Sequence, residues 1–118
     1  MNIDKYLPKR AAEHAAALLS PLGNRWLHVQ GVVQRAYNVS TLFEEEDQRY
    51  LIAAAYLHDI GYAPSLKKIE FHPLDGANDV IQTFKDVRLA SLVAHHSEAA
   101  FEARLRGYAH ALHAFLRC

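Results

Sequence analysis

The chain has 118 residues, a length that fits one domain and is too short for two. About half of it is hydrophobic (51%), enough to bury a core, and its 13 Lys and Arg balance its 13 Asp and Glu, so no overall positive field favours a long nucleic acid or an anionic membrane. The only cysteine is Cys118, which excludes an intrachain disulfide and fits a reducing compartment.

Apolar residues recur at helical spacing along the first half of the chain, with no sustained alternation that would indicate strands. A first helix is predicted from Pro8, a good first helical residue, to about Leu19. A second begins near Gly23, and a third runs from about Phe43 to His58, with acidic residues in its first turns, where the helix dipole favours them. The predicted core stripe of the second helix is Leu22, Trp26, Val29, Val33 and Ala36.

The second half continues the helical pattern after a predicted loop at 61–71. Pro73 opens a fourth helix, Asp86 is a suitable cap for a fifth that reaches about His96, and Ser97 can cap a sixth. The predicted core stripe of the fourth helix is Leu74, Ala77, Ile81 and Phe84, and that of the sixth is Phe101, Leu105, Tyr108, Leu112 and Phe115. The sequence therefore predicts an all-α protein, a single domain over residues 1–118 with five or six helices.

A His-Asp pair ends the third predicted helix. The residues Leu51, Ala54, Ala55 and His58 follow the spacing of one buried face, so His58 should point inward with Asp59 beside it. A buried carboxylate is costly unless it is paired, hydrogen-bonded or bound to a cation. The pair therefore indicates a binding site for a positive charge.

Further histidines fall near the ends of other predicted helices. His96 shares a buried face with Leu89, Leu92 and Val93, whereas His95 lies to one side of it. His28 flanks the core stripe of its helix, and His72 precedes Pro73, where a loop can aim the ring inward. Imidazole with carboxylate suits Fe, Mn, Zn, Co or Ni, so we expect a site for one or two divalent transition metal ions. The alternative for each histidine is a hydrogen bond within the core. We assign no site role to His14, His110 and His113, and a solvated face explains His110 and His113, which are one turn apart on the last helix.

Four stretches together resemble the HD-domain superfamily of metal-dependent phosphohydrolases, in particular the subset with additional histidines. They are RWLHVQGV around His28, AAYLHDIGYAP around His58 and Asp59, FHPLDGA around His72, and LVAHHS around His95 and His96. They cover most of the chain from Arg25 to about Gly107.

The resemblance implies roles for these residues. His28, His58 and Asp59 would hold a first metal ion, and Asp59 would bridge two ions when both are present. His72 with His96, His95 or both would complete a second position, with His96 favoured because its helical face is the buried one.

Such a site would hydrolyse a small phosphate ester, for which we expect a nucleotide. Two divalent ions can generate hydroxide and stabilise a phosphoryl oxygen without a protein nucleophile, and the sequence offers no convincing nucleophile. Arg25, one turn before His28 on the same face, is expected to bind the substrate phosphate and, with Asp59, to be catalytic. Lys67 and Lys68 are weaker candidates for the same phosphate, because a solvated loop explains them equally well.

One departure from the family pattern keeps other functions open. The family has a distal Asp on a later helix, yet no Asp follows Asp86, and Glu98 and Glu102 come too early to replace it. Either the chain is a shortened form or the site lacks one ligand. The alternatives are a degenerate HD domain that binds metal or nucleotide as a regulatory module, and a helical interaction domain with hydrogen-bonded histidines.

The sequence also gives expectations about cellular location, partners and assembly. The N-terminus lacks the apolar segment of a signal peptide, and the central apolar run LIAAAYL is too short to span a bilayer, so a cytoplasmic protein is expected. We expect no membrane partner and no long nucleic acid, and the apolar last helix could pair with a second copy in a homodimer.

Overall fold

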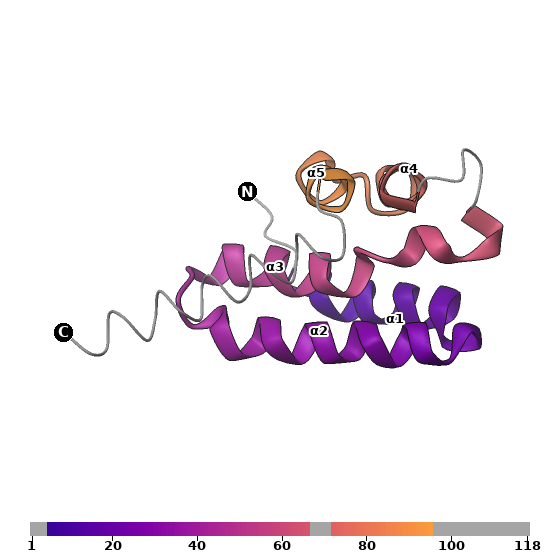
Figure 1. Ribbon diagram of the computed structural model, residues 1–118. Helices are drawn as coiled ribbons and strands as arrows, with labels where there is room; N and C mark the ends of the chain where they lie inside the picture. Colours follow the sequence, from indigo (N-terminus) through magenta and orange to yellow (C-terminus); the bar gives the residue numbers. More distant parts are fainter. Residues whose placement is uncertain (1–4, 67–71, 96–118) are drawn as a thin grey trace.

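The computed structural model describes residues 5–66 and 72–95, and in these ranges the chain is helical throughout with no strand. These ranges hold five α-helices, and short 3-10 helices lie between the first and the second and after the third (Figure 1). The elements are α1 (Leu7–Leu19), η1 (Ser20–Leu22), α2 (Asn24–Ser40), α3 (Glu45–Leu57), η2 (Ile60–Tyr62), η3 (Pro64–Leu66), α4 (His72–Phe84) and α5 (Val87–His95). The all-α fold predicted from the sequence is confirmed.

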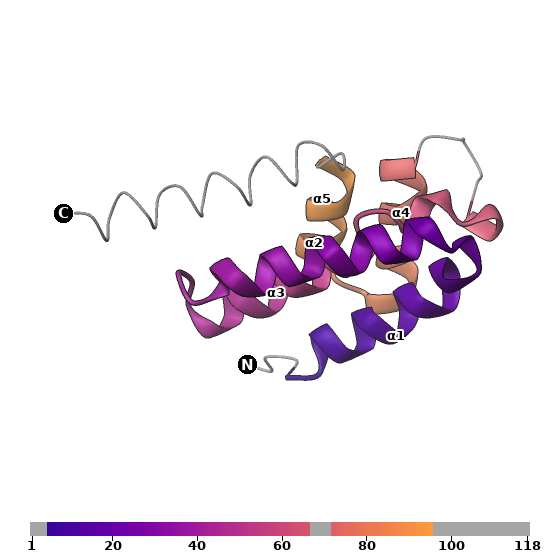
Figure 2. The same ribbon diagram turned by 60° about the horizontal axis from the view of Figure 1, so that its bottom comes forward.

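The helices form two layers. In the first, α3 packs against both α1 and α2, with α2 and α3 running alongside each other in both views and α1 at an angle to them (Figures 1 and 2). In the second, α4 packs against α5, and the two cross over the end of α3, so that Figure 1 shows them nearly end-on. The turn η2, which follows α3, contacts α4 and thereby joins the layers.

Helix boundaries follow the predicted signals closely. Pro8 lies in the first turn of α1, and the turn before α2 contains Gly23 at a φ of 59°, a backbone conformation that glycine adopts at no steric cost. Asp86 caps α5 as predicted, because its Oδ1 accepts a hydrogen bond from the backbone N–H of Leu89 at 3.0 Å. The predicted sixth helix lies outside the described residues.

The core lies around α3 and is made mostly of alanine, valine and leucine. In α2, Val29, Val33 and Ala36 are buried as predicted, while Leu22 and Trp26 are partly buried against the core. The α1 contribution is Leu7, Ala11, Ala15 and Leu19, and that of α3 is Ile52, Ala53, Ala54, Ala55 and Leu57. Small side chains on α1 and α3 let these two helices approach closely.

The predicted core stripe of α4 was wrong in part. Leu74 and Ile81 are 43% and 46% exposed, whereas Ala77 and Val80 are buried. The helix is rotated because its glycine, Gly76, faces η2 and α5 and permits a close approach there. The predicted loop after α3 also differs from expectation, because it begins with the two 3-10 turns η2 and η3.

Candidate metal centre

The end of α3 places the His-Asp pair inside the protein. His58 is the C-cap residue of α3 and Asp59 the residue before η2, and both side chains are fully buried. The Nδ1 of His58 lies 2.7 Å from the backbone oxygen of Ala55. A carbonyl oxygen only accepts hydrogen bonds, so Nδ1 carries a hydrogen, which leaves Nε2 as the nitrogen through which the neutral ring would ligate a metal.

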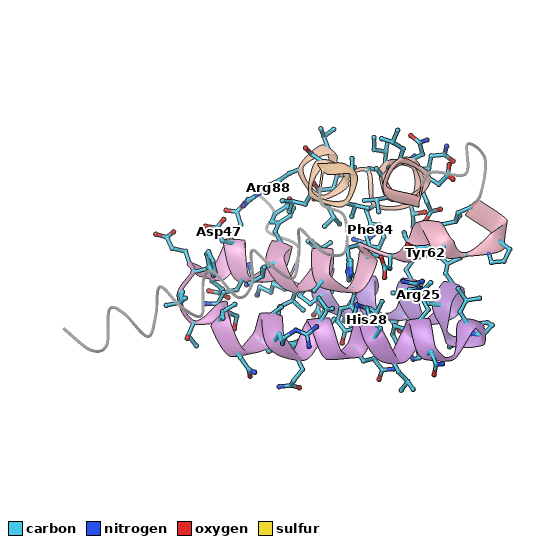
Figure 3. The ribbon with its side chains drawn as sticks, in the orientation of Figure 1. Arg25, His28, Asp47, Tyr62, Phe84 and Arg88 are labelled. Atoms are coloured by element: carbon cyan, nitrogen blue, oxygen red, sulfur yellow. The ribbon has the colours of Figure 1, made fainter. Side chains whose placement is uncertain are left out.

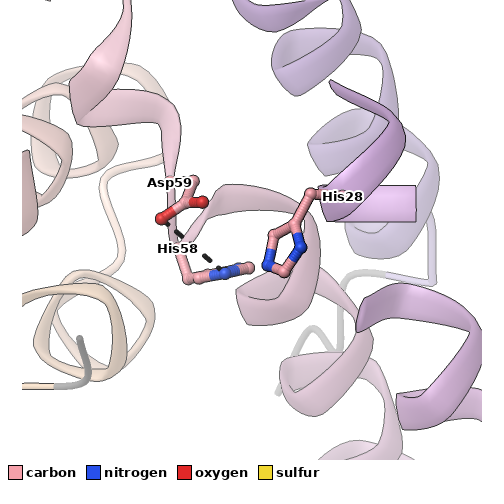
Figure 4. A group of neighbouring side chains, drawn as sticks. All are labelled: His28, His58 and Asp59. Carbon is pink, nitrogen blue, oxygen red and sulfur yellow. Dashed lines mark ion pairs between the residues drawn. The ribbon is translucent and has the colours of Figure 1, made fainter. Parts of the chain in front are cut away.

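His28 enters the same site from α2. One ligand atom from each of His28, His58 and Asp59 lies within 4.8 Å of the other two (Figure 4). The Nε2 of His58 is 3.7 Å from Oδ1 of Asp59. Two imidazoles and one carboxylate therefore converge. One imidazole comes from α2, and the other imidazole and the carboxylate come from the end of α3.

Arg25 lies on the other side of the carboxylate. Its Nη1 is 3.3 Å from Oδ2 of Asp59, and its guanidinium carbon is 3.7 Å from the centre of the Tyr62 ring (Figure 3). The Arg25 side chain is 32% exposed, whereas that of Asp59 is fully buried. A single cationic side chain thus connects the buried carboxylate with solvent.

Helix α4 supports the turn that carries the site. A Cβ atom placed on Gly76 would lie 3.3 Å from the backbone nitrogen of Gly61, from Cγ1 of Ile60 and from Cγ1 of Val93. Glycine at this position therefore lets α4 pack directly against the backbone that follows Asp59. The close approach fixes η2, and with it the orientation of Tyr62 and Asp59.

The structure brings together four of the residues expected in the site: Arg25, His28, His58 and Asp59. His72 begins α4 and His95 ends α5, but their side chains, and all of His96, Lys67 and Lys68, lie outside the described residues, so their roles stay predictions.

Of the three histidines that we did not assign to the site, His14 lies within the described residues. The Nε2 of His14 on α1 lies 2.5 Å from Oδ2 of Asp79 on α4, and its ring packs edge-on against Phe84. This contact joins the two layers, and it agrees with the structural interpretation of His14. His110 and His113 lie outside the described residues.

The sequence did not assign a role in the site to Tyr62 or Gly76. Tyr62 stacks on Arg25, and Gly76 permits the close approach of α4. Tyr62 follows Asp59 by three residues, so its position in HDIGY could have indicated it. The role of Gly76 depends on how α4 packs, which the sequence pattern does not show.

The arrangement fits a divalent transition metal ion. Neutral imidazole nitrogen and carboxylate oxygen are the donors that such ions select, and here one such atom of each residue lies within 4.8 Å of the other two. The hydrogen bond from His58 to Ala55 orients the ring, as the outer contacts of metal-bound histidines commonly do.

The fold and site define a helical protein with a cluster of two histidines and one aspartate that could hold a metal ion. The sequence model of the HD domain matches residues 10–114, and the chain therefore belongs to the HD-domain family, the superfamily of metal-dependent phosphohydrolases. A search of curated proteins and a search of solved structures each found no significant match. Within the described ranges, no helix has the length and apolar character needed to cross a membrane.

Proposed function

We propose that this protein is a metal-dependent phosphohydrolase that acts on a small phosphate ester, with a nucleotide as the expected substrate. The observation that carries the proposal is the convergence of His28, His58 and Asp59 within 4.8 Å, with the guanidinium of Arg25 on the same carboxylate. This combination offers a place for a metal ion and, beside it, a cation that reaches solvent.

Each residue has a distinct part in this proposal. His28 and His58 hold the metal through ring nitrogens, and Asp59 holds it through a carboxylate oxygen. The metal ion, when bound, would supply Lewis-acid stabilisation of a phosphoryl oxygen and an activated water.

Arg25 binds the phosphate of the substrate through the N–H groups that do not face Asp59, because the planar guanidinium suits phosphate geometry. Tyr62 keeps the guanidinium in place by stacking on it. The proposed partner is therefore a small phosphate-containing molecule, and pairing of the chain with a second copy remains a prediction.

Turnover of a phosphate panel tests the proposal. We expect the protein to hydrolyse a nitrophenyl phosphate ester or one of a set of nucleotides when Mn²⁺ is added, and the variant Asp59→Asn to lose this activity while keeping its helical content. The matched control is Asp47→Asn, the same change at an aspartate that is 48% exposed and pairs with Arg88 on the surface. A wild type that holds metal but turns over none of the panel would refute the enzymatic function.

One observation favours a second candidate function. Residues 87–118 contain no Asp, whereas the family pattern has a distal Asp on a later helix. A degenerate HD domain that binds metal or nucleotide for regulation fits this absence. It predicts stoichiometric metal, and nucleotide binding by calorimetry, without hydrolysis in the same panel.

A further inference from the structure

The two oxygens of Asp59 face different partners. Oδ1 lies 3.7 Å from Nε2 of His58, a second residue of the group that could hold a metal ion. Oδ2 lies 3.3 Å from Nη1 of Arg25. The carboxylate is fully buried, so its negative charge depends on positive charge that the protein or a ligand supplies.

Two contacts hold the Arg25 guanidinium beside Asp59, where it can supply this positive charge. The ring of Tyr62 covers one face of the guanidinium at 3.7 Å, and Asp59 contacts its edge at 3.3 Å. Both contacts come from the short segment that begins at the buried pair, so the guanidinium and the carboxylate are positioned by the same turn. Arginine remains protonated at every physiological pH, so this contact persists without a metal.

We propose that Arg25 is a resident counter-cation of the metal centre, which neutralises Asp59 in the metal-free protein and opposes the binding of a metal ion. This inference rests on the metal-binding part of the proposed function and goes beyond it, because it makes Arg25 the residue that sets metal affinity. A divalent ion at the His28, His58 and Asp59 position would lie close to a fixed positive charge and would share its carboxylate with it.

A role of Arg25 that is limited to orienting Asp59 predicts the opposite change in metal affinity. If Arg25 only oriented Asp59 as an outer contact, its removal would weaken metal binding, by about 10- to 100-fold for contacts of that kind. A resident counter-cation predicts that its removal strengthens metal binding and destabilises the metal-free protein. The direction of the change in metal affinity therefore separates the two roles.

The experiment measures Mn²⁺ binding to the metal-free full chain, from the electron paramagnetic resonance signal of unbound Mn²⁺. We expect Arg25→Gln to lower the dissociation constant at least about tenfold, and to lower the melting temperature of the metal-free protein. The matched control is Arg49→Gln on α3, which makes the same change in net charge at a guanidinium paired with Glu45, and should leave the Mn²⁺ affinity unchanged. An unchanged or weaker affinity in Arg25→Gln overturns the inference.

A second variant keeps the test decisive if metal-free Arg25→Gln does not fold. Tyr62→Leu removes the ring that holds the guanidinium and should also strengthen Mn²⁺ binding, by less than Arg25→Gln, whereas unchanged or weaker binding contradicts the proposal. Absence of Mn²⁺ binding by the wild type, repeated with Zn²⁺, Fe²⁺, Co²⁺ and Ni²⁺, would overturn the proposed function together with this inference. Metal binding that is insensitive to Arg25 overturns this inference alone.

Discussion

At the scale of single residues, two glycines in helix interiors have different surroundings. A Cβ atom on Gly76 in α4 would lie 3.3 Å from three atoms, one of them the backbone nitrogen of Gly61. A Cβ atom on Gly31 in α2 would meet only the end of the flexible Arg35 side chain, at 3.9 Å. The first glycine is required by packing, whereas the second is not.

These surroundings predict opposite effects of the same substitution. Gly76→Ala should lower the free energy of unfolding by about 1–3 kcal/mol, because the added methyl group forces α4 away from η2. Gly31→Ala should raise it by up to about 1 kcal/mol, because alanine has the higher helix propensity and the space is open. Urea unfolding measures both changes. Equal effects of the two substitutions would contradict this account of α4 packing.

At the scale of elements, a cluster of polar side chains ties α5 to α3. The hydroxyl of Tyr50 donates to Oδ2 of Asp86 at 2.6 Å, while Oδ1 of Asp86 caps α5. Arg88 stacks on the Tyr50 ring at 4.1 Å and donates to Asp47 at 2.7 Å. The hydrogen bond to Asp47 raises the pKa of Arg88 further above its usual value. Since α5 carries Val93, which lies against Gly76, this cluster also supports the packing between α5 and α4.

The Tyr50 hydroxyl makes this connection sensitive to alkaline pH. Burial, followed by the hydrogen bond to Asp86 and the charge of that carboxylate, raises the pKa of Tyr50 to about 12, from an ordinary value near 10. In the unfolded chain the hydroxyl ionises first, so its contribution to stability is complete below about pH 10 and is lost as the pH rises through about 12.

Tyr50→Phe should therefore reduce stability at neutral pH and flatten its decline in alkaline solution. We expect a loss of about 1–3 kcal/mol near pH 7, and a smaller difference from the wild type as the pH passes about 11. Urea unfolding across this pH range measures the difference. Tyr37→Phe, at a tyrosine of α2 that is 50% exposed, is the control and should follow the wild-type curve.

At the scale of the whole molecule, the sequence predicted what depends on local pattern and missed what depends on packing between layers. Helical periodicity and capping residues sufficed for the bounds of α1 and α3 and for the start of α5, and the buried face of α3 correctly placed His58 in the interior. The buried face of α4 was misassigned in part because Gly76, a residue without a side chain, decides which side packs inward. The stack of Tyr62 on Arg25 was missed because it depends on the 3-10 turn η2.

A metal ion bound at the candidate site should also stabilise the fold as a whole. The candidate ligands come from α2 and from the end of α3, so a bound ion would link these two neighbouring helices. An ion that binds only the folded state adds about 2.7 kcal/mol at a free concentration of 100 times its dissociation constant. We therefore expect added Mn²⁺ or Zn²⁺ to raise the melting temperature of the wild type by several degrees.

Two histidine variants with the same substitution separate this effect from ordinary packing. His28→Gln removes a metal ligand and should abolish the rise in melting temperature on metal addition. His14→Gln removes the contact with Asp79 that joins α1 to α4, so it should lower the melting temperature with and without metal while leaving the rise intact. Thermal unfolding followed by circular dichroism, with chelator and with metal, measures both quantities. A rise that persists in His28→Gln would show that the stabilising ion binds elsewhere.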